Sequence, residues 1–238
     1  MNAFSIPGAS LTVTVDIDRP PGPAAAGAPS AAELIARARD LVPMLRERAP
    51  QCEAERRVSD AVIGTLKDAG LFDVAKPVRY GGFEMGWDVF SETAVAVASG
   101  CGSTGWVYSV VGGHAAVLAR FGTDLMDEVW NADPDAIISS CRCTGAGFKR
   151  VEGGFQGSGA ASYSSGCLNA QWVIVEDLPI EGEERTLTVV LPMTEVDILD
   201  TWYVAGLAGT GTHNITFDDI FIPDHRTWFP GKPPHGES

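Results

Sequence analysis

Residues 136–175 read AIISSCRCTGAGFKRVEGGFQGSGAASYSSGCLNAQWVIV, and this stretch decides the fold that we expect. Three runs with the composition of β-strands are separated by glycine-rich turns. Gly153 and Gly154 stand between two of the runs, where a tight hairpin needs the positive φ angles that glycine adopts without a Cβ clash. Small polar residues gather at the strand ends: Ser139, Ser140, Ser164, Ser165 and Asn169. Hydroxyl and amide groups at the mouth of a sheet suit a flat ligand that forms hydrogen bonds, so we expect a cleft there.

The composition is that of a folded globular protein and argues against several classes of partner. Of the 238 residues, 45% are hydrophobic and 20% are charged. The formal net charge of −14 disfavours nucleic acid, whose phosphates need a basic face, and an anionic membrane surface. No apolar run is long enough to span a bilayer, and the first residues lack the basic start and apolar core of a signal peptide. We therefore expect a cytoplasmic protein with no nucleic-acid and no membrane partner.

The cysteines predict reduced thiols and no metal site. There are five of them, an odd number whose spacing fits no zinc pattern. Cys141 and Cys143 alternate along an expected strand and share one face, but nothing nearby supplies two further ligands. Half-buried, reduced thiols are the ordinary state of such residues in a cytosolic protein.

Helical patterns dominate the first half of the chain. After a proline- and alanine-rich lead-in, residues 1–29, which we expect to be disordered, Ser30 and Glu33 have the spacing of a capping box. Pro43 is expected to kink the helix that follows. Further helices are expected from about residue 60 to 70, over 87–99, over 104–121 and over 124–130. Together they predict a helical domain over residues 30–132.

The helix expected over residues 104–121 is apolar nearly all round, which predicts burial at the centre of the domain. Its consecutive glycines, Gly112 and Gly113, lower its intrinsic stability. We therefore expect another element to pack closely against that face.

After Asp133 and Pro134 the hydrophobic period changes from helical to alternating. Strands are expected over residues 136–143, 147–151, 154–163, 171–177, 186–191, 196–204 and 213–222. Seven short strands separated by turns are typical of a compact antiparallel barrel or sandwich. The sequence therefore predicts an α+β protein: a helical domain, an antiparallel β-barrel domain over residues 133–229, and a loose tail over residues 230–238.

Four segments in order resemble the acyl-CoA dehydrogenase superfamily, and more closely its flavin-dependent monooxygenase branch, the oxygenase components of two-component aromatic hydroxylases. They are RYGG at 79–82, GCGSTGWV at 100–107, GGFQGSGAASYSSGCLNAQWVIV at 153–175 and GLAGTGTHNITFDDIFIPDHR at 206–226. Each motif is weak alone, but their order and spacing over residues 30–229 make a chance similarity improbable. Tyr163, Ser164 and Ser165 stand where true acyl-CoA dehydrogenases carry a Trp-Ile-Thr or Trp-Ile-Ser motif, which favours the monooxygenase branch.

The resemblance implies a helical domain, a middle β-barrel and a C-terminal four-helix bundle, with reduced flavin between barrel and bundle. This sequence stops where the bundle would start. The bundle would supply much of the flavin and substrate site and most of the subunit contact. We therefore expect a homo-oligomer, or a partner chain that supplies the bundle, to cover the face near Ser140, Ser165 and the turn at Gly209.

The resemblance also assigns roles to single residues, each with a structural alternative. It places His114 against the phenolic oxygen of a substrate, although a buried histidine with a satisfied hydrogen bond is the alternative. It places Ser140 and Ser165 beside flavin and substrate, with Ser164 next to them, where turn serines that bond their own backbone are the alternative. Of these serines, Ser165 is the one that we expect to have a catalytic role, with its hydroxyl next to the flavin ring.

Two more residues are expected to bind the cofactor. Trp106 matches a tryptophan that lies near the isoalloxazine, although a helix-packing aromatic is an equal alternative. Thr210 belongs to the turn Gly209-Thr210-Gly211-Thr212, which resembles a family turn that brings backbone amides toward flavin. Asp218 and Asp219 fit a solvated strand end better than a catalytic pair.

The resemblance thus implies an oxygenase component that hydroxylates a phenolic or polyketide-like aromatic compound of secondary metabolism. A separate flavin reductase would supply reduced FMN, or FAD, and oxygen would be the second substrate. A protein of a different class is the alternative: a non-catalytic or repurposed small-molecule-binding protein, a scaffold, or a subunit of a split enzyme. An acyl-CoA dehydrogenase is a weaker alternative.

Overall fold

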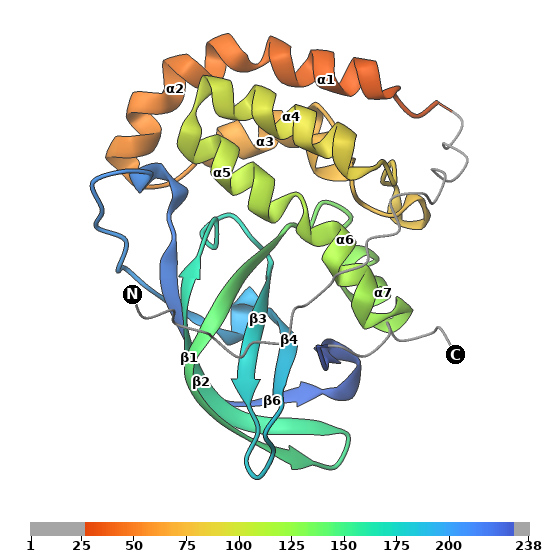
Figure 1. The fold of residues 1–238 in the computed structure, drawn as a ribbon, viewed down its shortest axis with the longest axis vertical. Coiled ribbons are helices and arrows are strands. Elements are labelled where there is room, and N and C mark those ends of the chain that lie inside the picture. The colour runs from red at the N-terminus through yellow and green to blue at the C-terminus, as the bar shows by residue number, and fades with distance from the viewer. Residues whose placement is uncertain (1–26, 231–238) are drawn as a thin grey trace, which may run out of the picture.

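The computed structural model describes residues 27–230, so most of the expected lead-in and tail lies outside the described residues. Helices cover one end of a curved sheet (Figure 1). They are α1 (Ala31–Asp40), α2 (Val42–Glu55), α3 (Asp60–Asp68), α4 (Trp87–Gly100), α5 (Gly102–Val111), α6 (His114–Leu118) and α7 (Thr123–Trp130), with short 3-10 turns between several of them. The division into two domains stays a prediction, but the change from helices to strands falls between residues 130 and 138, as the pattern indicated.

The first helix begins at the capping box that the sequence predicts, and it ends just before a proline. Ser30 Oγ accepts the amide of Glu33 at 3.3 Å, and a Glu33 carboxylate oxygen accepts the amide of Ser30 at 2.6 Å, which completes the capping box. The kink expected at Pro43 is a full break at Leu41 instead. Pro43 then lies in the first turn of α2, where its missing N–H removes no helical hydrogen bond.

The single helix expected over residues 104–121 is wrong, because the chain divides it at Gly112 into α5, α6 and a 3-10 turn. An added Cβ at Gly112 would lie 3.0 Å from the Phe90 ring, so the close packing expected at the glycines is present. The all-round burial is also incomplete. Tyr108 is fully buried, but 49% of Trp106 is exposed, one turn from the start of α5.

The sheet contains seven strands in the order β5-β6-β2-β1-β3-β4-β7. They are β1 (Ile138–Val151), β2 (Gly154–Ser164), β3 (Trp172–Pro179), β4 (Thr186–Pro192), β5 (Asp197–Leu199), β6 (His213–Pro223) and β7 (Thr227–Trp228). The hairpin between β1 and β2 forms where it was expected, with Gly153 at φ +77°. The two strands expected over 136–143 and 147–151 are one continuous β1, and the strand expected over 196–204 is shortened to β5.

The predicted α+β architecture is confirmed, with a mixed sheet in place of a purely antiparallel one. β1 pairs with β3 in parallel, while the other named pairs are antiparallel. After β2, residues 165–171 carry the chain past the start of β1, so β3 adds to the other edge of β1 and runs in its direction. The hydrophobic period of a strand indicates which face of the sheet each residue occupies, but it does not indicate which strand lies beside it. The parallel pairing of β1 with β3 was therefore not predictable from the period.

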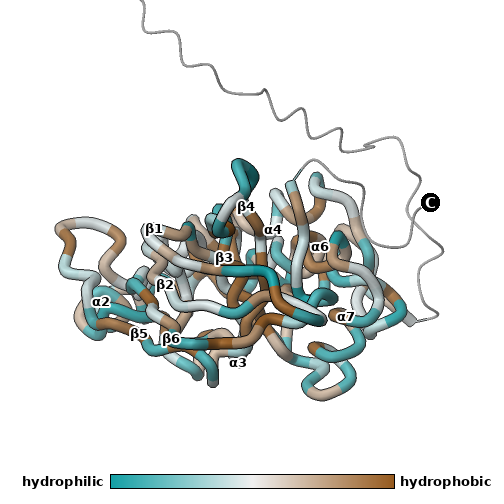
Figure 2. The backbone as a smooth tube through the Cα atoms, turned by 90° about the horizontal axis from the view of Figure 1, so that it is seen from below, coloured by the Kyte–Doolittle hydropathy of each residue, from teal (hydrophilic) through white to brown (hydrophobic). Residues whose placement is uncertain are grey.

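Three clusters of buried residues hold the fold together. One lies among the helices α1 to α5, one lies inside the curved sheet, and one joins α6 and α7 to β1, β3 and β4. Figure 2 shows hydrophobic segments along the strands and a hydrophilic turn between β3 and β4. The third cluster fixes α6 against the sheet, and it therefore fixes the position of His114 at the first residue of α6.

Candidate functional site

The end of β2 is distorted in a way that turns its last serines in different directions. The pairing of β2 with β6 shifts register between Ala161 and Ser164, and Tyr163 has a left-handed φ of 66°. Such bulges re-aim side chains at the edges of sites. Gly166 follows at φ +70°, and a Cβ there would lie 2.9 Å from Val107 of α5. This glycine lets the strand end approach the helix closely, which places Ser165 against α5.

Ser165 lies in a chain of hydrogen bonds that begins at Trp106. The indole Nε1 of Trp106 donates to Ser165 Oγ at 3.0 Å. Ser165 Oγ lies 2.9 Å from Thr212 Oγ1, which lies 2.6 Å from Thr210 Oγ1. Thr210 Oγ1 donates to the carbonyl of Leu207 at 2.9 Å. The structure thus brings together three predicted cofactor-binding residues and one residue, Thr212, to which no role was assigned.

The direction of this hydroxyl chain follows from its two ends. An indole N–H can only donate and a carbonyl can only accept. Since the one proton of Thr210 is given to Leu207, the proton of Thr212 goes to Thr210, and the proton of Ser165 goes to Thr212. Every hydroxyl proton is therefore committed. Ser165 is buried, while Trp106 is half exposed beside it, so the chain ends at the surface of the protein.

Ser164 points to the other side of the strand end and is fully buried. Its hydroxyl donates to Ser139 Oγ at 3.3 Å, and Ser139 donates to the carbonyl of Trp172 at 3.3 Å. These bonds fasten β2 to β1 and β3. Ser164, which the resemblance placed next to the flavin, is therefore closed off from the surface in this structure and takes no part in the hydroxyl chain.

His114 begins α6 and faces β1. Its Nδ1 lies 2.6 Å from the carbonyl of Ile138, which fixes the proton on Nδ1 because the carbonyl can only accept. Burial lowers the pKa of His114, and the bond to Ile138 opposes that shift in part. The imidazole is therefore neutral at pH 7, with an unprotonated Nε2 that has no hydrogen-bond partner among residues 27–230.

Ser140 lies two residues beyond Ile138 on the same face of β1 and is partly buried. In the part of the chain that the structure describes, its hydroxyl forms no hydrogen bond with another side chain or carbonyl. Ser140 is separate from the hydroxyl chain, and it shares its strand with the carbonyl that orients His114.

The segment between β5 and β6, the blue loop beside α2 in Figure 1, is held by a cluster around Asp200. Arg56, the C-cap of α2, donates to both Asp200 oxygens at 2.7 and 2.9 Å, and Tyr203 donates to Oδ2 at 2.6 Å. His213 Nδ1 accepts the amide of Thr201 at 3.2 Å, and burial lowers its pKa. The loop is therefore anchored at its base, although its outer residues are exposed.

Large apolar side chains are exposed around the hydroxyl chain and on this loop. Tyr163 and Tyr203 are each 69% exposed. The ring of Tyr163 meets Trp202 edge to face, with centroids 6.3 Å apart. The exposed apolar face comprises Trp106, Tyr163, Tyr203, Val204 and Leu207. Exposed apolar patches of this kind are common at contact surfaces of proteins.

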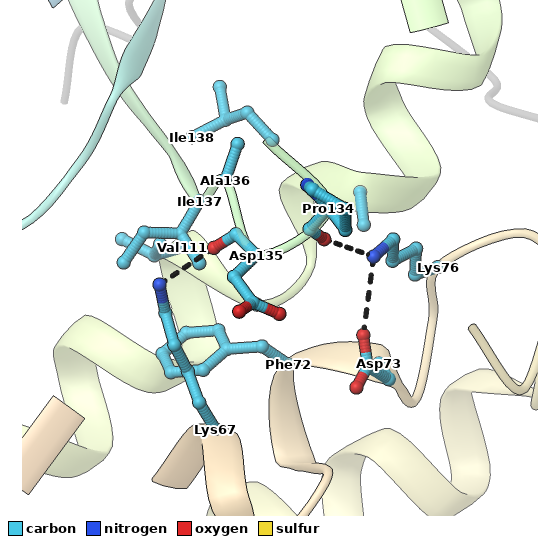
Figure 3. A pocket seen from close by; sticks show the side chains of 12 residues that line it. Lys67, Phe72, Asp73, Lys76, Val111, Pro134, Asp135, Ala136, Ile137 and Ile138 are labelled. Atoms are coloured by element: carbon cyan, nitrogen blue, oxygen red, sulfur yellow. Dashed lines mark hydrogen bonds and ion pairs between the residues drawn. The ribbon is translucent and has the colours of Figure 1, made fainter. Parts of the chain in front are cut away.

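Figure 3 shows a small cavity of about 30 Å³ between α3 and the start of β1. Lys67 Nζ donates to the carbonyl of Asp135 at 2.7 Å. Lys76 is buried and donates to the carbonyl of Pro134 at 2.5 Å and to Asp73 at 3.5 Å. The cavity has room for about one water molecule. The two lysines brace the passage from helices to sheet, and the cavity is not a ligand site.

Two open hollows lie on the far part of the sheet. One, of about 580 Å³, is lined by residues of β1 and β2 that include Gly147 and Gly157. The other, of about 550 Å³, is lined by residues around β5 and β6 that include Phe217 and Phe221. Neither touches the hydroxyl chain or His114. The hydroxyl chain and His114 therefore lie apart from both hollows.

Within the described range, no cluster of histidine, cysteine or carboxylate side chains could hold a metal ion, and the five cysteines are free. Among those same residues, no helix is long and apolar enough to cross a membrane.

Sequence reasoning missed three residues that the structure brings to the site. Thr212 lies inside a quoted motif but carried no assigned role. Ser139 was noted as a polar strand-end residue, without its bond to Ser164. Glu53 accepts the amide of Ala208 at 3.1 Å, a contact across 155 positions of sequence for which no local signal exists.

Comparison with known proteins gives consistent matches over most of the chain. Residues 30–132 match the family described as acyl-CoA dehydrogenase, N-terminal domain. Over 200 residues the chain is 38% identical to the flavin-dependent monooxygenase oxygenase subunit HsaA of Mycobacterium tuberculosis, covering 82% of this chain and 50% of that one. Over 196 residues it is 34% identical to the oxygenase component of the FADH2-dependent resorcinol hydroxylase of Rhizobium sp., covering 81% and 48%.

A solved structure agrees with the fold. The crystal structure of the HsaA monooxygenase from M. tuberculosis has a TM-score of 0.80 and 36% sequence identity, and the match covers 84% of this chain and 54% of that one. The chain therefore spans about half the length of the relatives that it matches.

Proposed function

Because residues 30–132 belong to the acyl-CoA dehydrogenase N-terminal domain family and the chain is a relative of oxygenase components of two-component flavin monooxygenases, we propose that it takes part in hydroxylating a phenolic or polyketide-like aromatic compound. Reduced flavin supplies the activation of oxygen. Within this proposal, the residues of the chain bind the flavin edge, orient the aromatic ring and exclude water.

The observation that carries the proposal is the directed hydroxyl chain from Trp106 through Ser165, Thr212 and Thr210. It places a half-exposed indole face beside a row of hydroxyls, and a flat ring with polar edges can pack on the first and bond with the second. The Ser165 hydroxyl donates its proton to Thr212. To donate to a flavin edge instead, the hydroxyl would rotate and give up its bond to Thr212. Ser165 is then the residue proposed to donate to the flavin, with Trp106 packed beside the ring.

His114 is the group proposed to meet the substrate oxygen. Its unprotonated Nε2 can accept the proton of a phenol, and the bond from Nδ1 to Ile138 stabilises the imidazolium that results. Burial lowers the pKa of His114, so the charge develops only when a phenolate is beside it. Ser140, on the same face of β1, is proposed to bind the same ligand.

Reduced FMN is the proposed cofactor, with FAD as the alternative, and a separate flavin reductase is the proposed source. The relatives are oxygenase components and subunits, and the resorcinol hydroxylase is described as FADH2-dependent. No group in the described hydroxyl chain would distinguish the two flavins, because it faces the ring and not the adenylate.

The exposed apolar face supports assembly. Trp106 is 49% exposed although its N–H is satisfied, and Tyr203 and Leu207 are exposed on an anchored loop. A second copy of this chain, or a partner chain that supplies a helical bundle, is the proposed cover. The flavin would then lie between this face and the covering helices.

A non-catalytic role is the second candidate, and it is favoured by the hydroxyl chain, whose protons are all bonded within the protein. In that case the same face binds a small aromatic molecule and no oxygen chemistry follows.

Binding of reduced flavin tests the proposal. The protein is dialysed to equilibrium against chemically reduced FMN in the absence of oxygen, with oxidised FMN as the matched ligand. The proposal expects tighter binding of the reduced form. Equal or absent binding of both forms would favour the non-catalytic candidate.

A further inference from the structure

Glu53, near the end of α2, is bonded to two segments that are distant from it in sequence. One of its oxygens, Oε2, accepts the amide of Ala208 at 3.1 Å. The other, Oε1, accepts the amide of Gly209 at 3.3 Å and the hydroxyl of Ser103. We propose that Glu53 is the positioning residue that holds both ends of the hydroxyl chain in register for the flavin, an inference that rests on the function proposed above.

The two segments carry the first and last members of the hydroxyl chain. Ser103 lies in the first turn of α5, and Trp106 follows it by three residues on the same helix. Ala208 and Gly209 form the 3-10 turn that ends at Thr210. A single carboxylate thus fixes the helix that carries the indole donor and the turn that carries the last hydroxyl. No other carboxylate in the described part of the chain bonds both segments.

These donors favour an acceptor that carries negative charge. Two backbone amides of one turn and the hydroxyl at a helix N-terminus all point their protons at the same carboxylate. Hydrogen bonds to an ionised acceptor are about twice as strong as neutral ones, and the N-terminus of α5 favours negative charge. The N-cap of α5, Cys101, provides no side-chain hydrogen bond, so Glu53 is the acidic group that acts at this helix end.

Packing closes the other side of the turn. A Cβ at Gly209 would lie 2.4 Å from Cys52 Sγ, so the turn already touches α2 and cannot approach it further. Glu53 prevents the opposite movement, away from α2. An outward shift of the turn would carry Thr210 and Thr212 away from the end of β2, and it would break the hydroxyl chain where Ser165 Oγ lies 2.9 Å from Thr212 Oγ1.

The test compares Glu53→Gln with Glu55→Gln, a matched control that removes the same charge from the same helix end. Glu55 accepts a bond from Gln51 and has none with the turn. Glutamine at position 53 keeps one acceptor oxygen but faces an amide proton with its own NH2 group. In Glu53→Gln we expect amide hydrogen exchange in residues 207–210 to become about tenfold faster and the dissociation constant for reduced FMN to rise about tenfold. In Glu55→Gln we expect both quantities to stay at their wild-type values.

Ser103→Ala provides a milder variant that keeps the carboxylate and both amide bonds. We expect it to weaken reduced-FMN binding about threefold, with unchanged exchange at residues 207–210. This variant, together with circular dichroism of each protein, shows whether weaker flavin binding comes from a misplaced hydroxyl chain or from unfolding of the protein.

Each outcome decides the inference. If wild type binds reduced FMN and Glu53→Gln binds it equally well, the positioning role is overturned and the proposed function stands. If exchange in residues 207–210 is unchanged in Glu53→Gln, the role is likewise overturned. If wild type binds no flavin at all, the proposed function fails, and the inference fails with it.

Discussion

The indole Nε1 of Trp106 donates to Ser165 Oγ at 3.0 Å, across 59 positions of sequence and between a helix and a strand end. It supplies the first proton of the hydroxyl chain, while the carbonyl of Leu207 at the far end sets the direction of the hydroxyl protons. It also keeps Trp106 half exposed at the surface while its polar atom is satisfied. Under the proposed function, a flavin edge that accepts from Ser165 would therefore need to turn only the Ser165 proton.

Replacing Ser165 by alanine is predicted to weaken the binding of reduced flavin. The change removes one buried hydroxyl and leaves both the indole of Trp106 and Thr212 without that partner, at a cost of about 1 kcal/mol, or about fivefold in the dissociation constant. It also raises the fraction of oxygen released as hydrogen peroxide, measured with a peroxidase-coupled dye. Ser99→Ala is the control, because that hydroxyl donates to its own helix. An unchanged dissociation constant and peroxide fraction in Ser165→Ala would assign the serine to structure alone.

Replacing His114 by asparagine is predicted to weaken the binding of a phenol most near neutral pH. Asparagine can still donate to the carbonyl of Ile138, but it cannot accept the phenol proton or carry charge. We expect about a tenfold loss in affinity, measured by titration from pH 6 to 8. Should the variant unfold while its folded fraction binds the phenol as wild type does, His114 is a core residue.

Stability against pH provides a second test of His114. Burial lowers its pKa in the folded state, whereas the unfolded chain has an ordinary value near ~6.5. Below that value the unfolded state binds more protons, so the free energy of unfolding falls as the pH is lowered from 7 toward the folded pKa. His213 contributes in the same direction, because burial lowers its pKa as well. Urea unfolding of wild type and His114→Asn is predicted to show a shallower fall in the variant, and parallel curves would contradict the buried neutral state.

Gly112→Ala is predicted to destabilise the helical region by about 1 to 3 kcal/mol, because the new methyl group meets the Phe90 ring and the Tyr108 carbonyl. Gly64→Ala is the matched control. Nothing lies within 4 Å of a Cβ at Gly64, inside α3, so alanine there is predicted to stabilise by up to about 1 kcal/mol. Thermal unfolding followed by circular dichroism measures both. A neutral Gly112→Ala would show that the break between α5 and α6 is not set by close packing.

The exposed apolar face is predicted to be covered in solution, by a second copy or by a partner chain. Light scattering at micromolar concentration is expected to give a dimer or larger species for the isolated protein. Val204→Asp is predicted to shift it toward the monomer, while Val95→Asp, on α4, leaves it unchanged, although Val95 is 68% exposed. If the wild-type protein alone is a monomer, a second copy does not cover the face, and a partner chain is the remaining cover. If the protein also stays a monomer when mixed with helical-bundle partner chains, the prediction is contradicted.

Local patterns predicted the parts of the fold that local physics determines. The capping box at Ser30, the hairpin at Gly153 and the change of period after Pro134 depend on neighbours within a few residues, and the structure has all three. At Gly112 the sequence predicted a weakness in the helix but not a break, and the Phe90 ring that packs against this glycine comes from another helix. The parallel pairing of β1 with β3 depends on strand order, which periodicity does not encode.

The candidate site divides in the same way. Trp106, Ser165 and Thr210 were named from motifs, but their connection through Thr212 is a tertiary contact with no local signal. Glu53 lies outside every quoted motif and reaches the site through the fold alone. The roles of these residues remain predictions that ligand binding has to test.

Transfer of oxygen to a phenol tests the central proposal most directly. The protein is mixed with chemically reduced FMN, a phenol such as resorcinol, and 18O-labelled oxygen. The mass of the aromatic product is then measured by mass spectrometry. We predict one labelled oxygen atom in the ring of the product with wild type, and a large loss of that product with His114→Asn. Oxidation of the flavin at the rate of free flavin, with all of the labelled oxygen recovered as peroxide and water, would contradict the proposal.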